Sequence, residues 1–148
     1  MANFKQGFYI PKNPQKYIHI NNRLNEGNRF PKYRSSWELK FFKFLDNTES
    51  IRYWTSEPLG IKYYHPFKQK ICNYYPDFMF MRACQTPEGE ILKKIIVEIK
   101  PSGQATKPKT AYEKEQFYIN KAKWKAAKEF CDKNNMEFCI LTEKDLKI

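Results

Sequence analysis

The chain has 148 residues, and its 27 Lys and Arg against 16 Asp and Glu give a formal net charge of +11. Its length predicts one compact domain, and 41% hydrophobic residues are enough for a core, which excludes a wholly disordered chain. No run approaches the roughly 18 apolar residues of a membrane span, and the first residues lack the apolar stretch of a secretory signal, so we expect no membrane insertion. The charge predicts polyanionic partners, of which nucleic acid is the commonest; the alternatives are an anionic membrane surface and a charge that serves solubility alone.

The cysteines and histidines offer little chemistry. Cys72, Cys84, Cys131 and Cys139 form no Cys-x-x-Cys pair, which argues against a zinc module or a dense disulfide framework. We expect reduced, mostly buried thiols. The two histidines are isolated in the sequence, so a reaction would rely on carboxylates and lysines.

The N-terminal part of the chain differs from the rest. Residues 1–33 are rich in Asn, Lys, Pro and aromatic residues and have no lasting helical or strand period, which predicts a basic, aromatic arm ahead of a domain over residues 34–148. The first predicted helix follows this arm. Ser35 as N-cap and Glu38 three residues later form a capping box, and the helix should end near Asn47.

The rest of the chain predicts strands around a second helix. Runs of aromatic and β-branched residues predict three strands, at 61–64, 74–81 and 91–99. A long helix over 110–133 and a last strand over 136–142 follow. The order is helix, three strands, helix, strand, and the late strand–helix–strand unit predicts a parallel pair.

Glu38 is the first residue that suggests a site. At about 100° per residue it stands in the middle of the apolar face of the first helix. Lys40, Lys43 and Asp46 fall on the opposite, polar side. The capping box alone explains Glu38, but a carboxylate within an apolar face also needs a cation or hydrogen bonds to offset its desolvation.

A second group of polar residues lies on two predicted strands. Asp77 follows Pro76 inside an apolar run, and Glu98 and Lys100 share one strand face about 7 Å apart. A turn centred between residues 87 and 88 pairs Asp77 with Glu98, a turn one step later pairs it with Lys100, and both registers put all three side chains on one face. The alternatives are a solvated turn at Asp77 and an exposed ion pair at the other two. Two close carboxylates beside a lysine suit Mg²⁺ or Mn²⁺ chemistry.

These motifs resemble the PD-(D/E)xK nuclease superfamily, with Pro76-Asp77 on one strand, Glu98-Ile99-Lys100 on the next and a preceding helix that carries Glu38. Three further segments look like those of the head completion nucleases of tailed bacteriophages, and the likeness covers essentially the whole chain. These segments are residues 10–17, 33–39 and 75–78.

The resemblance implies an α/β fold with a restriction-endonuclease-like core, a mixed β-sheet flanked by helices, similar to the endonuclease subunit of heteromeric transposases. It implies a metal-dependent DNA endonuclease of phage head completion, in the host cytoplasm or the virion, with head, portal or neck proteins as partners. Catalytic roles would fall to Glu38, Asp77, Glu98 and Lys100, and Mg²⁺ or Mn²⁺ would bind the three acids and the Ile99 carbonyl. The alternatives are a junction-resolving nuclease and a structural head-closure protein that binds DNA ends.

Contacts to double-stranded DNA are expected from the arm and from the second helix, through phosphates rather than bases. Gln116 and Lys123 intrude into the apolar face of that helix and are candidates for supporting the site, although a lysine whose ammonium extends to solvent explains Lys123 equally well. The expected phosphate contacts are Lys12, Lys16, Arg23, Arg34, Lys114, Lys121, Lys125 and Lys128.

Overall fold

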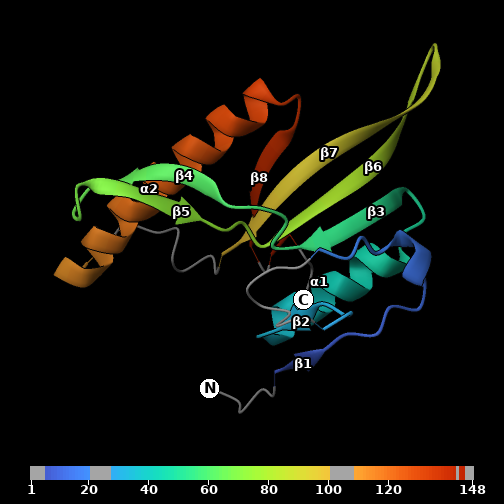
Figure 1. Cartoon of the computed structure of the whole chain (residues 1–148), viewed down its shortest axis with the longest axis horizontal. Helices are drawn as coiled ribbons and strands as arrows, with labels where there is room; N and C mark the ends of the chain where they lie inside the picture. Colours follow the sequence, from blue (N-terminus) through green and yellow to red (C-terminus); the bar gives the residue numbers. More distant parts are fainter. Residues whose placement is uncertain (1–5, 21–27, 101–108, 143, 146–148) are drawn as a thin grey trace.

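The computed structural model describes residues 6–20, 28–100, 109–142 and 144–145, and it is a mixed α/β fold (Figure 1). Two helices, a short 3-10 turn and eight strands make up this part of the chain. In chain order they are β1 (Gly7–Phe8), η1 (Pro14–Lys16), β2 (Lys32–Tyr33), α1 (Ser36–Asn47), β3 (Ile51–Ser56), β4 (Ile61–His65), β5 (Lys70–Tyr74), β6 (Phe78–Thr86), β7 (Gly89–Ile99), α2 (Ala111–Lys133) and β8 (Glu137–Leu141).

The central sheet has four strands in the order β3-β6-β7-β8. Strands β3, β6 and β7 pair antiparallel, whereas β8 returns after α2 and pairs parallel to β7. A parallel neighbour requires a crossover connection, and α2 provides it. The mixed sheet with flanking helices confirms the expected restriction-endonuclease-like architecture, and the parallel pairing of β8 was also predicted correctly.

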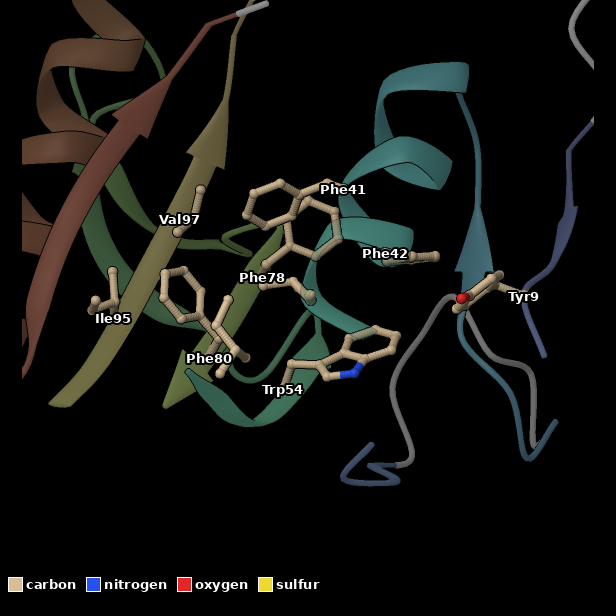
Figure 2. Close-up of a cluster of buried hydrophobic side chains, with 10 residues drawn as sticks. Tyr9, Phe41, Phe42, Trp54, Phe78, Phe80, Ile95 and Val97 are labelled. Atoms are coloured by element: carbon tan, nitrogen blue, oxygen red, sulfur yellow. The ribbon is translucent and has the colours of Figure 1, made fainter. Parts of the chain in front are cut away.

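One face of this sheet packs against α1 through an aromatic core. Phe41 and Phe42 of α1 meet Phe78 of β6, with ring centroids 4.7 and 5.3 Å apart (Figure 2). Trp54 of β3 and Tyr9 of the N-terminal segment close the same cluster. This packing puts α1 across the end of the sheet from which β6 begins.

The other face of the sheet carries α2 and the β4–β5 hairpin. Adjacent residues of β8 belong to different cores, since Phe138 packs with α2 and Cys139 packs in the α1 core. Side chains alternate along a strand, so the two cores lie on opposite faces. The hairpin forms a separate two-stranded sheet whose Ile61, Tyr63 and Tyr74 are buried beside α2 (Figure 1).

The described part of the N-terminal segment packs tightly onto the α1 core. Tyr9 lies 6.0 Å from the Phe42 ring, and Tyr17 bridges to Trp54 with ring centroids 5.0 Å apart. Asp46, expected on the polar side of α1, is instead fully buried because this segment covers it.

The strand prediction was wrong in three places. In the described chain five strands, not three, lie between α1 and α2, because β3 and β5 were not foreseen. The expected strand at 61–64 belongs to the separate hairpin rather than to the central sheet. The expected strand at 74–81 is divided between β5 and β6, since Pro76 lacks the N–H that a ladder needs.

The four cysteines are free, as expected, but only Cys131 is buried and the other three are half-buried. Burial raises the pKa of the Cys131 thiol to about 11. Within the described residues, no helix is long and apolar enough to span a membrane.

Candidate active site

The β6–β7 hairpin brings Asp77 and Glu98 together. Its register pairs Thr86 with Gly89 and Phe78 with Val97, so Asp77, one residue before β6, stands opposite Glu98. This is the first of the two registers that place the acids and Lys100 on one face. The Ile99 N–H donates to Oδ2 of Asp77 at 2.8 Å and fixes the orientation of this carboxylate.

Each carboxylate oxygen of Glu98 has a partner. Glu98 is only 9% exposed, and the Tyr74 hydroxyl, at the end of β5, donates to its Oε1 at 2.5 Å. The Lys100 ammonium lies 3.8 Å from Oε2 of the same carboxylate. Tyr74 therefore ties the β4–β5 hairpin directly to the candidate site.

The two carboxylates disfavour each other's charge. Burial raises the pKa of Asp77, the charge of Glu98 raises it further, and the bond from the Ile99 N–H opposes both effects. Burial also raises the pKa of Glu98, against the Tyr74 hydrogen bond and the charge of Lys100. Such a buried like-charge pair is stabilised by any cation that enters between its members.

Glu38 takes part in a different set of contacts. Ser35 caps α1 as predicted, because its hydroxyl accepts from the Glu38 N–H at 3.1 Å, but only this half of the expected capping box is formed. The Glu38 carboxylate, however, accepts from the Arg34 N–H at 2.9 Å and lies 3.7 Å from the Arg34 guanidinium. Its charge also contributes to the raised pKa of Asp77, so Glu38 belongs to the same electrostatic neighbourhood.

Glu57 lies at this edge of the sheet and was not foreseen. It follows β3 with a φ of +40°, its N–H donates to the Asp77 carbonyl at 2.8 Å, and its side chain is nearly fully buried. Arg34 lies 3.7 Å from the Glu57 carboxylate and so bridges Glu38 and Glu57. The signal was the β-forming run Ile51–Ser56 ahead of Glu57, which was not interpreted as a strand.

No complete metal-binding cluster is assembled among the residues that the structure describes. In that part of the chain, no group of three His, Cys, Asp or Glu side chains is placed to hold one ion. What is brought together is the pair Asp77 and Glu98 with Lys100, and Glu38 is held nearby on Arg34.

The residues expected to contact DNA fall into several settings. Lys12 is exposed, Arg34 is engaged by two carboxylates, and Arg23 lies outside the described residues. The Lys16 ammonium donates to the carbonyls of Leu45, Asp46 and Thr48 at 2.8–2.9 Å, so it caps α1 rather than extending into solvent. Lys114, Lys121, Lys125 and Lys128 are all exposed along α2, and the Lys128 ammonium lies 3.9 Å from the Asp132 carboxylate.

Lys123 reaches toward the candidate site from α2. Its ammonium lies 5.9 Å from the Tyr63 ring and 5.7 Å from the Tyr74 ring, and its charge lowers the pKa of Glu98. Gln116 is half-buried on α2. Of the two α2 residues expected to support the site, Lys123 therefore acts on Glu98 through its charge.

Comparison with known proteins identifies the family to which this chain belongs. Residues 48–143, which include Asp77, Glu98 and Lys100, match the TnsA-like endonuclease N-terminal family. The chain belongs to the TnsA-like endonucleases. A curated relative, the head completion nuclease of Enterobacteria phage T4, is 31% identical over 147 residues, which cover 95% of this chain and 93% of the relative. Both expected resemblances, to the phage nucleases and to the transposase endonuclease, are thus confirmed for this TnsA-like endonuclease.

Proposed function

We propose that this chain is a divalent-metal-dependent DNA endonuclease that acts in phage head completion. The family supports the endonuclease activity, and the name of the phage T4 relative supports the biological role. The single observation that carries the chemistry is the close, mutually repelling pair of half-buried Asp77 and buried Glu98, with Lys100 beside it.

The donor groups of this pair suit Mg²⁺ or Mn²⁺. Hard cations take oxygen ligands, and Mg²⁺ is often held by one or two carboxylates, with waters and substrate phosphates as its other ligands. Asp77 and Glu98 would supply the carboxylates and Ile99 its carbonyl oxygen. Glu38 is the further carboxylate in reach of this neighbourhood, and it would exchange its bonds to Arg34 for the metal. A partial protein cage that is completed by DNA agrees with the lack of a preformed cluster in the described chain.

The side chains of the protein would position the reacting groups. Tyr74 and the Ile99 N–H hold the two carboxylates in fixed orientations. The Lys100 ammonium, anchored on Glu98, has further N–H groups that can bind a phosphate oxygen or orient the attacking water. The chemistry that a bound metal supplies is acidification of a water and shielding of the phosphate charge.

The substrate we propose is double-stranded DNA, bound through its phosphates. The exposed lysines belong to α2, the helix that packs with Tyr74 on the face of the sheet that carries Glu98. Head, portal or neck proteins would be the partners in the infected cell or the virion, since head completion is a step of particle assembly.

Nicking of a supercoiled plasmid tests the proposal. We expect nicking that requires Mg²⁺ or Mn²⁺ and that falls by about a hundredfold or more in Asp77→Asn and Lys100→Ala, because each change removes a group that acts on the reacting phosphate or its water. Glu88→Gln, in the exposed β6–β7 turn, is the matched control and should nick normally. Glu38→Gln keeps the Ser35 cap but loses the charge, so normal nicking in this variant would leave Glu38 with a structural role at the start of α1 only.

Two results would contradict the proposal. Nicking at an equal rate in the presence of chelator would exclude a metal-dependent reaction. DNA binding without any nicking would favour the alternative of a structural head-closure protein. Calorimetric titration with Mn²⁺ adds a readout independent of turnover, since Asp77→Asn should weaken binding of the ion.

A further inference from the structure

The β4–β5 hairpin has an apolar face that stands open in the part of the chain that the structure describes. Its inner side packs on α2, but on its outer side Tyr64 and Ile71 are paired across the strands and are 56% and 59% exposed. Phe67, in the turn between the strands, is 50% exposed. Large apolar side chains gathered on one exposed face commonly mark a binding surface.

The charge of the hairpin indicates the class of partner. Between Ile61 and Tyr74 the chain has three lysines, Lys62, Lys68 and Lys70, all exposed, and no acidic residue. Aromatic rings interspersed with cations are the combination that binds unpaired nucleic acid, because lysines contact phosphates while the rings stack on bases. A purely apolar protein partner would not need these charges.

The turn that carries Phe67 is held in one conformation. His65 is buried, and its Nδ1 accepts from the N–H groups of Phe67 at 3.2 Å and Lys68 at 3.0 Å. The Gln69 N–H donates to the His65 carbonyl at 2.9 Å, and Gln69 takes a φ of +53° that closes the turn. A fixed turn presents its aromatic ring with little loss of entropy on binding.

The hairpin is joined to the candidate active site at its base. Tyr74 ends β5 and donates to Glu98, and Lys123 of α2 lies against the rings of Tyr63 and Tyr74. The four residue steps of β4 span about 13 Å at the rise of an extended strand. DNA lying along the hairpin would thus reach the carboxylates within a few nucleotides.

We propose that the outer face of the β4–β5 hairpin binds unpaired bases of DNA next to the bond that is cut, by stacking on Tyr64 and Phe67. The protein then favours DNA with a single-stranded tail or gap over a blunt duplex. This inference rests on the proposed nuclease function and specifies its substrate.

Fluorescence anisotropy of the full-length chain in chelator, with a labelled single strand, a tailed duplex and a blunt duplex, tests the inference without cleavage. The double variant Tyr64→Ala/Phe67→Ala should bind the single strand and the tailed duplex about tenfold or more weakly, because two stacked bases are lost. Binding of the blunt duplex should not change. Tyr64→Phe retains stacking and should bind like the wild type, and Tyr53→Ala removes an exposed aromatic ring of β3 as the control.

The outcomes separate the two proposals. Equal single-strand binding by the wild type and the double variant overturns the hairpin inference, while plasmid nicking by the same preparation leaves the nuclease function intact. Sedimentation adds a further outcome. If the wild type is a dimer and the double variant is not, while DNA binding is unchanged, the surface binds a second copy of the chain and the hairpin inference is overturned. A wild-type chain that neither nicks nor binds DNA would overturn both.

Discussion

Asp77 and Glu98 are costly residues for the stability of this fold. Each carboxylate is partly or largely taken out of water near a like charge, and each accepts a defined hydrogen bond, Asp77 from Ile99 and Glu98 from Tyr74. Groups that destabilise the folded state commonly occur at functional sites. The cost should therefore be measurable in the protein without metal.

Asp77→Asn should stabilise the metal-free protein at alkaline pH. The pKa of Asp77 is raised in the folded chain, so the folded state holds a proton that the unfolded state releases. The stability of the wild type should consequently fall as pH rises from the ordinary carboxyl range through the folded pKa. Asn keeps an acceptor for the Ile99 N–H and removes the charge, so its free energy of unfolding at pH 9 should exceed that of the wild type by at least about 1 kcal/mol.

Urea unfolding in chelator at acidic and alkaline pH measures this difference. The gap between the variant and the wild type should narrow at acidic pH, where the wild-type carboxyl is protonated. Parallel pH profiles for the two proteins would show that Asp77 is not the strained group.

Arg34 explains how further acids are tolerated near this pair. Its guanidinium lies 3.7 Å from Glu38 and from Glu57, and its charge lowers the pKa of both Asp77 and Glu98. Its first role in the free protein is thus to neutralise carboxylates. A contact to DNA phosphate would compete with this role.

At the scale of elements, the end of α1 depends on the N-terminal segment. The last carbonyls of a helix lack partners within the helix. Here the Lys16 ammonium binds three carbonyls at this end, and Asn13 donates its side-chain amide to the Asp46 carbonyl at 2.9 Å. The Asp46 carboxylate accepts in return from the Tyr9 hydroxyl and from the N–H groups of Lys12 and Asn13 at 2.5–3.0 Å.

Asp46→Asn should destabilise the protein at neutral pH. Burial alone would raise the pKa of Asp46, but the three hydrogen bonds outweigh burial and lower it. A lowered pKa means that the carboxylate stabilises the folded state above the ordinary pKa of about 4 and that this contribution is lost as pH falls through the folded pKa. We expect a loss of about 1.5–3 kcal/mol near pH 7, the usual range for hydrogen bonds to a buried charge.

Thermal unfolding of Asp46→Asn and wild type between pH 7 and pH 2 checks this expectation. The difference in Tm should shrink at the acid end. Asn47→Asp at the neighbouring exposed position controls for a general effect of charge at the helix end. If the difference in Tm between Asp46→Asn and the wild type stays constant with pH, the loss of stability comes from altered packing rather than from the lost charge.

Local signals predicted the helices better than the strands. The predicted cap Ser35 placed the start of α1, because a cap is formed within a few residues of chain. The helix expected over 110–133 begins one residue later, at Ala111, with Thr110 as its cap. The turn between β6 and β7 narrowed their register to two alternatives for the same reason, and the structure has the first of them. By contrast, β3 was missed, since its burial does not alternate and a bulge interrupts its pairing after Ile51.

The candidate site was likewise predictable only where local sequence determines it. One hairpin aligns Asp77, Glu98 and Lys100, so their pattern was recognisable in the sequence. Glu57 was hidden because its position depends on β3, and Tyr74 because its contact with Glu98 depends on a separate two-stranded sheet. The engagement of Lys16 with the end of α1 likewise requires a fold of the N-terminal segment that composition does not specify.

At the scale of the whole molecule, two groups of exposed lysines lie on one side of the central sheet. The exposed lysines of α2 and those of the β4–β5 hairpin belong to elements on the face of the sheet opposite α1 (Figure 1). Cations gathered on one face attract a polyanion to that face. Phosphate contacts by lysine carry no sequence information, so we expect little preference among duplex sequences.

Lys121→Ala/Lys125→Ala should flatten the salt dependence of duplex binding. Each phosphate neutralised by a protein cation contributes about −0.9 to the slope of log K against log salt, so loss of two contacts should change the slope by about 1.8. Lys40→Ala/Lys43→Ala on the exposed side of α1 removes the same charge from the other face and should change the slope much less. Titrations of one duplex at several salt concentrations provide the slopes. Equal flattening of the slope by both double variants would mean that the net charge, rather than the α2 face, attracts DNA. Strong discrimination between unrelated duplexes would mean that the protein recognises bases and not only phosphates.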